Sequence, residues 1–249
     1  MTRAWRLLVA GVVVYLLFLV VSIPASRITP RLEQQMEGLS LQAVTGTVIS
    51  GAAGRIVIQG YGIGPVSWSL RPLSLLLGRL EYGAASTDPA LRGSATIGLG
   101  LNDVLVVRDL VADLQPGPLI NRFSPVPVDT TGVLELRIPT LEFEADFPRE
   151  LSGSLTWSDA RILDPLDLAF GQVVAELSRR EDALVASING HSDALTMAGE
   201  FTVTPAGRYN LNLVLTPGAV LAPEVIDTLR TFGQPGPGGG YLITDAGQL

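Results

Sequence analysis

Residues 39–82 read LSLQAVTGTVISGAAGRIVIQGYGIGPVSWSLRPLSLLLGRLEY, and this stretch sets the pattern for the rest of the chain. Its short runs alternate between apolar residues and small or polar ones, most clearly at Val66, Trp68 and Leu70. A period of two is typical of β-strands with one buried face. An apolar turn at residues 72–77 follows, and we expect it to cover the face of the strand that carries Trp68.

The same alternation recurs through the remaining sequence, and turn signals rich in Pro, Gly, Asn and Asp separate the runs. The runs lie at residues 56–58, 66–70, 91–101, 134–138, 141–147, 151–157, 173–177, 184–188, 195–203 and 209–215, with turn signals at 87–89, 148–149, 181–182, 189–190 and 205–207. About ten strands are predicted in this way, and they meander without intervening helices. The fold class is therefore all-β, with a mostly antiparallel sheet.

Helices are predicted at few places in this β region. Residues 223–232 carry apolar residues at helical spacing, begin with a proline and are followed by a glycine. Residues 72–77 and 118–123 are each expected to form about one helical turn. Residues 234–240, QPGPGGG, predict a flexible break before a short last strand at 241–244.

The N-terminal segment predicts a membrane anchor. Residues 7–26 contain no charged side chain, and as a helix they would span about 30 Å, the thickness of the hydrocarbon core. Arg3 and Arg6 precede the run, and no small-residue cleavage site follows it, which disfavours a cleaved signal peptide. The very short leading segment favours a cytoplasmic N-terminus. We expect a retained transmembrane helix at residues 1–26 and one periplasmic β domain at 27–249.

One series of motifs resembles a known family. It consists of GTV at 46–48, Gly51, VSWSLRP at 66–72, LLG at 76–78 and GSLTW at 153–157. In this order and spacing the motifs resemble the N protein of the bacterial type II (general) secretion pathway. The resemblance implies a non-enzymatic, single-pass component of the inner membrane. It also implies contact with other inner-membrane platform components of that machinery or with the secretin.

Glycines near the starts of alternating runs suggest a weak internal repeat. They are Gly46, Gly93, Gly132, Gly153 and Gly199. Glycine in neighbouring strands permits bulges and close approach, so the sheet is expected to curve. Such a sheet is similar to the curved groove of AsmA-like proteins, and a partly open barrel or sandwich is the other shape that fits. The AsmA-like shape implies an alternative function, the binding or transfer of lipid in the periplasm.

Composition leaves little room for catalysis or for nucleic-acid binding. The net charge is -7, cysteine is absent and all 17 basic residues are arginines. A nucleic-acid surface needs clustered basic residues, which this balance disfavours. The single histidine, His191, has no histidine or cysteine partner for a zinc site, and a P-loop would need a lysine. We expect no catalytic residue, no cofactor and no metal.

Carboxylates at Glu142, Glu144 and Asp146 form the densest polar row. On one strand all three would share a face, opposite an apolar face. A catalytic pair of carboxyl groups needs contrasting environments, whereas this row is expected to be solvated. A solvated row fits a cation or a basic partner, and a hydrolase that uses acidic residues is the remaining alternative.

Two tryptophans, Trp68 and Trp157, each occupy the apolar face of a predicted strand. Packing in the core is the ordinary role of such residues, and exposure in a binding groove is the alternative. We therefore treat Trp68, Trp157 and the acidic row as structural or interaction candidates.

Overall fold

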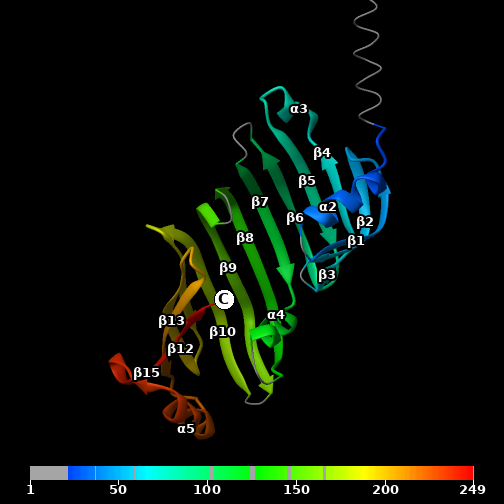
Figure 1. The fold of residues 1–249 in the computed structure, drawn as a ribbon. Coiled ribbons are helices and arrows are strands. Elements are labelled where there is room, and N and C mark those ends of the chain that lie inside the picture. Colours follow the sequence, from blue (N-terminus) through cyan, green and yellow to red (C-terminus); the bar gives the residue numbers. More distant parts are fainter. Residues whose placement is uncertain are drawn as a thin grey trace, which may run out of the picture. The chain divides into compact units, whose positions relative to one another are not determined.

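The computed structural model describes residues 22–36, 38–58, 60–100, 104–123, 127–144, 147–164 and 167–248 (Figure 1). The chain divides into two compact units, one that ends at Pro89 and one that begins at Ala90. Both units consist mainly of antiparallel strands, so the predicted mostly antiparallel sheet with few short helices is confirmed.

The first unit begins with short helices and continues as a small sheet. Its elements are η1 (Ala25–Arg27), α2 (Thr29–Gln35), β1 (Leu39–Gly46), β2 (Ser50–Ile58), β3 (Tyr61–Ile63), β4 (Val66–Leu70), α3 (Pro72–Leu75) and β5 (Leu80–Thr87). The strands lie in the order β1, β2, β4, β5. Strand β2 pairs with β4 through Ser50 to Ala53 and with β3 through Ile56 to Ile58.

The chain enters this unit directly from the apolar N-terminal run. Pro24 forms a β-bridge with Thr47, and the carbonyl of Ile23 accepts a hydrogen bond of 3.1 Å from the amide of Val48. Helix α2 is then tied to β1, because Glu33 Oε1 accepts a hydrogen bond of 2.6 Å from the amide of Leu41. These contacts hold the first described residues against β1 and the turn between β1 and β2.

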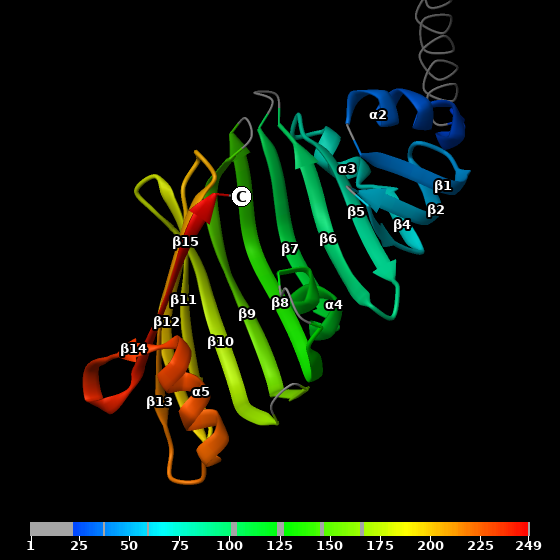
Figure 2. The same ribbon diagram turned by 60° about the horizontal axis from the view of Figure 1, so that its bottom comes forward.

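The second unit is one long meander. Its strands are β6 (Leu91–Leu99), β7 (Leu105–Leu114), β8 (Asp129–Glu144), β9 (Phe147–Asp164), β10 (Leu168–Arg180), β11 (Ala183–His191), β12 (Leu195–Val203), β13 (Arg208–Pro217), β14 (Gln234–Pro235) and β15 (Tyr241–Gln248). Each strand from β6 to β13 pairs with the next one, and β15 follows β13 with β14 beside it. The sheet curves, so that β12, β13 and β15 stand at an angle to β8 and β9 (Figure 2).

Helices α4 (Pro116–Phe123) and α5 (Pro223–Phe232), with the short η2 (Pro237–Gly239), complete the second unit. The apolar side of α5 packs on β12, β13 and β15. The buried side chains of this cluster are Leu195, Leu215, Leu221, Val225 and Leu229. Among the described residues, Leu195 is the largest side chain that is fully buried, so the core is thin.

Some predicted elements have different bounds in the structure. The predicted runs at 134–138 and 141–144 belong to the single strand β8, while Phe147 begins β9 and pairs with Glu144. The turn signal at Asn189–Gly190 is wrong, because both residues pair with β10 inside β11. Residues 234–240 form β14 and η2 rather than an irregular break.

The predicted membrane helix lies almost wholly outside the described residues, which begin at Ser22. Within the described part of the chain, no helix has both the length and the apolar character needed to cross a membrane.

Candidate functional site

Trp68 lies at the centre of the first unit, in the middle of β4. It pairs with Gly51 of β2 on one side and with Ala84 of β5 on the other. Because Gly51 has no side chain, the indole ring lies directly over its backbone: a Cβ atom there would be 2.6 Å from Trp68 Cζ2. The indole nitrogen donates a hydrogen bond of 3.3 Å to the carbonyl of Thr47.

An apolar pocket of about 380 Å³ lies beside this indole. Its lining comes from η1 and α2, from β1, β2 and the turn between them, and from Trp68 of β4 and Tyr82 of β5. The lining residues are Ala25, Ile28, Thr29, Leu32, Leu41, Val44, Val48, Ile56, Trp68 and Tyr82. The sequence singled out Trp68, but the pocket depends on the way α2 folds back onto β1, which no motif signals.

The pocket offers packing surface rather than reactive groups. Among the described residues, its lining contains no carboxylate, histidine, arginine or lysine. The hydroxyl of Thr29, at the start of α2, donates to the carbonyl of Ala25 in η1 at 3.2 Å. Burial raises the pKa of the Tyr82 phenol, so this hydroxyl stays neutral at physiological pH. The described lining can hold an apolar group, and within it neither hydroxyl has a neighbouring general base that would activate it.

Trp157 occupies a similar position in the second unit. It lies on β9, and its indole nitrogen donates a hydrogen bond of 3.0 Å to the carbonyl of Thr131 on β8. The ring stacks on Phe170 of β10, with 6.1 Å between the ring centroids. Trp157 and Trp68 are both half-buried. The two predicted aromatic candidates thus lie in different units.

The predicted acidic row is interrupted by a strand end. Glu142 and Glu144 are the last acidic residues of β8, and Asp146 lies outside the described residues. The expectation of one continuous strand through 141–147 is wrong, because β8 ends at Glu144. Glu142 is half-buried and lies opposite Glu150 of β9, whereas Glu144 is exposed. In the described part of the chain, no group of three or more His, Cys, Asp or Glu residues could hold a metal ion.

His191 is exposed at the end of β11, where its Nδ1 lies 3.0 Å from Thr196 Oγ1. This contact joins His191 to a threonine hydroxyl on the neighbouring strand, and among the described residues it is not part of a Ser-His-Asp arrangement.

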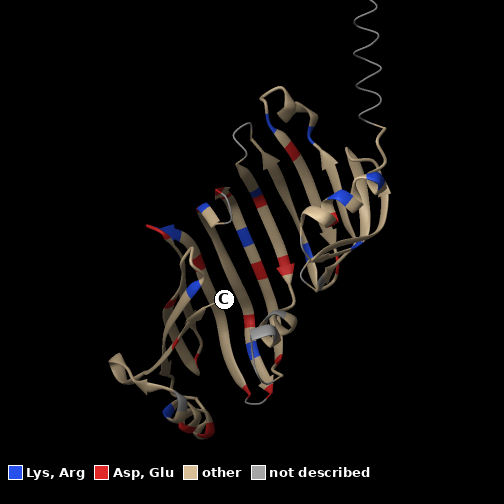
Figure 3. Ribbon diagram, viewed as in Figure 1, with Lys and Arg blue, Asp and Glu red and all other residues tan. Residues whose placement is uncertain are grey.

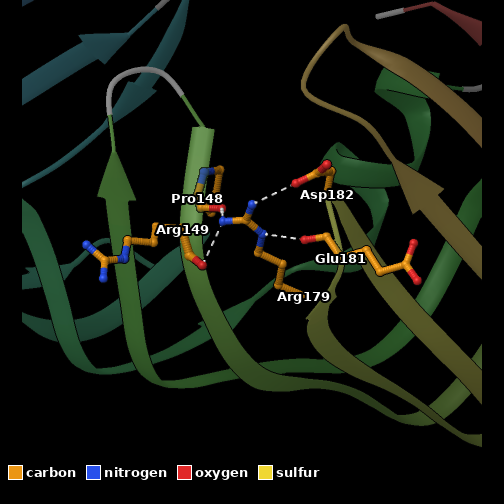
Figure 4. A network of polar contacts seen from close by, with 5 residues as sticks. All are labelled: Pro148, Arg149, Arg179, Glu181 and Asp182. Atoms are coloured by element: carbon orange, nitrogen blue, oxygen red, sulfur yellow. Dashed lines mark hydrogen bonds and ion pairs between the residues drawn. The ribbon is translucent and has the colours of Figure 1, made fainter.

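Arg179 forms a polar network that the sequence did not signal (Figure 4). Its guanidinium donates hydrogen bonds to the carbonyls of Pro148, Arg149 and Glu181 at 3.2, 2.8 and 3.0 Å. It also lies 3.4 Å from a carboxylate oxygen of Asp182. One side chain therefore joins the start of β9 to the β10–β11 turn, which is a structural role.

The apolar turn after β4 also differs from expectation. It does not cover Trp68, because Leu73, Leu76 and Leu77 are at least 75% exposed. Trp68 is instead flanked by the pocket formed with α2.

Comparisons with known proteins give a consistent result. Residues 37–244 match the family model for the type II secretion system (T2SS), protein N. The chain is 30% identical over 221 residues to the type II secretion system protein N of Vibrio cholerae serotype O1, which covers 86% of each chain. The protein of the same description from Aeromonas hydrophila is 26% identical over 242 residues, or 95% of each chain. The one from Klebsiella pneumoniae is 29% identical over 222 residues, or 87% of this chain and 84% of that one. No solved structure matches the chain.

Proposed function

The chain belongs to the type II secretion system protein N family, and from this premise we propose that it is a non-enzymatic inner-membrane component of the secretion machinery. In this proposal residues 1–26 anchor the chain in the inner membrane with a cytoplasmic N-terminus. Both β units then lie in the periplasm and support assembly or function of the export apparatus.

The observation that carries this proposal is the extent of the family match. It runs from residue 37 to residue 244, through nearly all described strands of both units. A match confined to one small module would support only a shared fold element. A match that spans residues 37–244 supports a shared role of both units in protein secretion.

The structure around the chain's entry point supports the anchor. The uncharged run reaches Ser26, and Ile23 and Pro24 within it already contact the β1–β2 turn. No flexible linker separates the run from the sheet at this point. An anchored chain would therefore hold its first unit close to the membrane surface.

The proposed partners are other inner-membrane platform components or the secretin. For the contact itself we propose the acidic row of Glu142, Glu144 and Asp146, facing a basic patch on the partner. Complementary charge of this kind mainly sets encounter rate and specificity. The AsmA-like lipid-handling alternative receives no support from the comparisons, whose reported relatives are type II secretion system N proteins.

A topology experiment tests this proposal. The chain is fused after Leu249 either to alkaline phosphatase, which is active only outside the cytoplasm, or to a fluorescent protein that matures only inside it. We expect phosphatase activity and no fluorescence. The opposite pattern would overturn the orientation.

Retention of the anchor needs its own measurement. Membranes from the same cells are washed at alkaline pH, which removes peripheral proteins, and the N-terminus of the retained chain is sequenced. We expect an integral protein that still carries residues 1–26. A mature N-terminus near Ala25 would show that the segment is a cleaved signal peptide.

A further inference from the structure

The turn after β4 exposes an unusual set of leucines. We call residues 72–78 the leucine turn; it comprises α3 and the residues up to Gly78. Leu73, Leu75, Leu76 and Leu77 are between 49 and 83% exposed. Large apolar side chains exposed together are a mark of contact surfaces for a protein or a membrane.

Local hydrogen bonds hold the leucine turn in a defined conformation. Ser74 is buried, and its hydroxyl donates a hydrogen bond of 2.6 Å to the carbonyl of Arg71. The carbonyl of Ser74 in turn accepts hydrogen bonds of 3.0 Å from the amides of Leu77 and Arg79. Within this turn Ser74 is buried, whereas the leucine side chains on either side of it are exposed to solvent.

Positively charged arginine side chains flank the leucine turn on both sides. Arg71 precedes the leucine turn and Arg79 follows it, and both are exposed. Figure 3 shows basic segments at both bases of this turn. A leucine turn flanked by arginines suits an anionic membrane surface. The leucine side chains can enter the hydrocarbon region of the bilayer while the guanidinium groups stay at the lipid phosphates.

The position of the leucine turn indicates that its contact is with the membrane. Ile23, which lies in the uncharged run, accepts a hydrogen bond from Val48. The adjacent residue, Ile49, accepts one of 2.7 Å from Leu70, just before the leucine turn. The chain therefore enters the first unit at the same end of its sheet as the leucine turn, as Figure 1 shows.

We propose that the leucine turn is a second membrane contact, which inserts its leucines into the surface of the bilayer that holds the N-terminal run. The inference rests on the proposed anchor. Two attachment points on one unit restrict its tilt relative to the bilayer more than a single anchor does. The first unit would then present a constant face to the rest of the secretion machinery.

Site-specific fluorescence in vesicles tests this contact. The chain contains no cysteine, so Leu76→Cys gives a unique site for an environment-sensitive dye in the full-length protein. Ile58→Cys is the control, because Ile58 is 44% exposed at the opposite end of β2. The labelled proteins are reconstituted into vesicles of phosphatidylethanolamine and phosphatidylglycerol that carry a nitroxide-labelled lipid. We expect roughly twofold or greater quenching at position 76 relative to position 58.

The outcomes separate the leucine turn from the anchor. Equal quenching at both positions, in protein that resists alkaline extraction, would overturn the second contact and leave the anchor intact. Quenching at position 76 in protein that alkaline extraction removes would overturn the anchor and keep the membrane contact. Shielding of the dye that appears only with other secretion proteins present would overturn the inference in favour of a protein partner. If Leu76→Cys does not fold, as judged by tryptophan emission, Leu77→Cys replaces it.

Discussion

The indole nitrogen of Trp68 donates a hydrogen bond of 3.3 Å to the carbonyl of Thr47. The second unit repeats this relationship, since Trp157 donates to Thr131 at 3.0 Å. In both cases a glycine makes room for the ring: a Cβ would lie 2.6 Å from Trp68 Cζ2 at Gly51, and 2.8 Å from Trp157 Nε1 at Gly132. In each unit a large aromatic residue thereby packs across neighbouring strands, in a sheet with few fully buried side chains.

Gly51→Ala should destabilise the first unit by about 1–3 kcal/mol, the usual cost of an overpacked site. The new methyl group would meet the Trp68 ring and the carbonyl of Thr45, each at 2.6 Å, so the indole must move. Urea unfolding followed by tryptophan emission measures the change.

Gly83→Ala is the matched control, because a Cβ there meets its nearest atom at 3.7 Å. It should be neutral or slightly stabilising, since alanine restricts the unfolded chain. Equal loss of stability in both variants would show that the sheet does not tolerate an added side chain at either position. The contact between residue 51 and Trp68 would then not explain the effect.

Trp68→Ala should lower the free energy of unfolding by about 3 kcal/mol, the lower end of the range for large aromatic residues, because Trp68 is half-buried. Trp68→Phe keeps most of the ring contacts and loses the hydrogen bond to Thr47, which is worth about 1 kcal/mol. Denaturant midpoints monitored by circular dichroism test both values. A wild-type midpoint in Trp68→Ala would assign Trp68 to ligand binding rather than to packing.

The sequence predicted most clearly those elements whose signals are local. The helix at 223–232 has the predicted bounds, because Pro223 suits a first helical turn and Gly233 ends it. The long strands β8 and β9 were harder to predict, because register shifts change which face a residue occupies. One shift lies between Arg137 and Thr140, next to a proline that from sequence alone predicts the end of a strand.

The candidate site was predictable only in part. Alternation predicted that Trp68 lies on the apolar face of its strand, and in the structure Trp68 lines the apolar pocket. The pocket wall could not be predicted, because Ile28 and Leu32 reach Trp68 only after the chain folds back. The apolar run of the leucine turn was expected to cover the Trp68 face, and its exposure was not predictable because a short apolar run does not reveal what it packs against.

Arg179→Gln should destabilise the second unit by about 1–2 kcal/mol, because three backbone carbonyls lose a charged donor. Arg180→Gln is a control on the same strand. The side chain of Arg180 is 59% exposed, and its ion pair with Glu200 is a surface pair, worth about 0–1 kcal/mol. Hydrogen exchange at the start of β9 should speed up only in the Arg179 variant. Equal exchange rates in the two variants would contradict the proposed link between β9 and the β10–β11 turn.

Asp167→Asn should make stability less dependent on acid pH. Arg161 donates two hydrogen bonds of 2.6 Å to Asp167, and these hydrogen bonds lower the pKa of its carboxyl group below the ordinary 3.8. A lowered pKa stabilises the folded state above the ordinary value, and this contribution is lost as the pH falls through the folded-state pKa.

At neutral pH the wild-type protein should therefore unfold at a slightly higher urea concentration than Asp167→Asn. This difference should disappear below pH 3.8. Asp164→Asn, which leaves the pair with Arg161 in place, is the control. A difference that persists unchanged in acid would show that the effect of the variant comes from packing rather than from charge.

Removing the carboxylates of Glu142, Glu144 and Asp146 together, as Gln and Asn, should leave the fold intact. Glu142 faces Glu150 across the β8–β9 pair, and like charges directly opposite each other are destabilising. The triple variant should thus unfold at the wild-type midpoint or slightly above it. If the row docks a basic partner, association should weaken and lose much of its salt dependence.

A second triple variant controls for net charge. Glu224, Asp227 and Asp245 lie on α5 and β15, and neutralising them changes the net charge by the same amount. Because charge complementarity acts at the contact surface, only the first triple variant should alter the salt dependence of partner binding, measured by co-purification at increasing salt. Equal effects of the two variants would assign the attraction to overall charge. Normal folding and normal partner binding in the first variant, combined with loss of secretion, would revive a catalytic role for the acidic row.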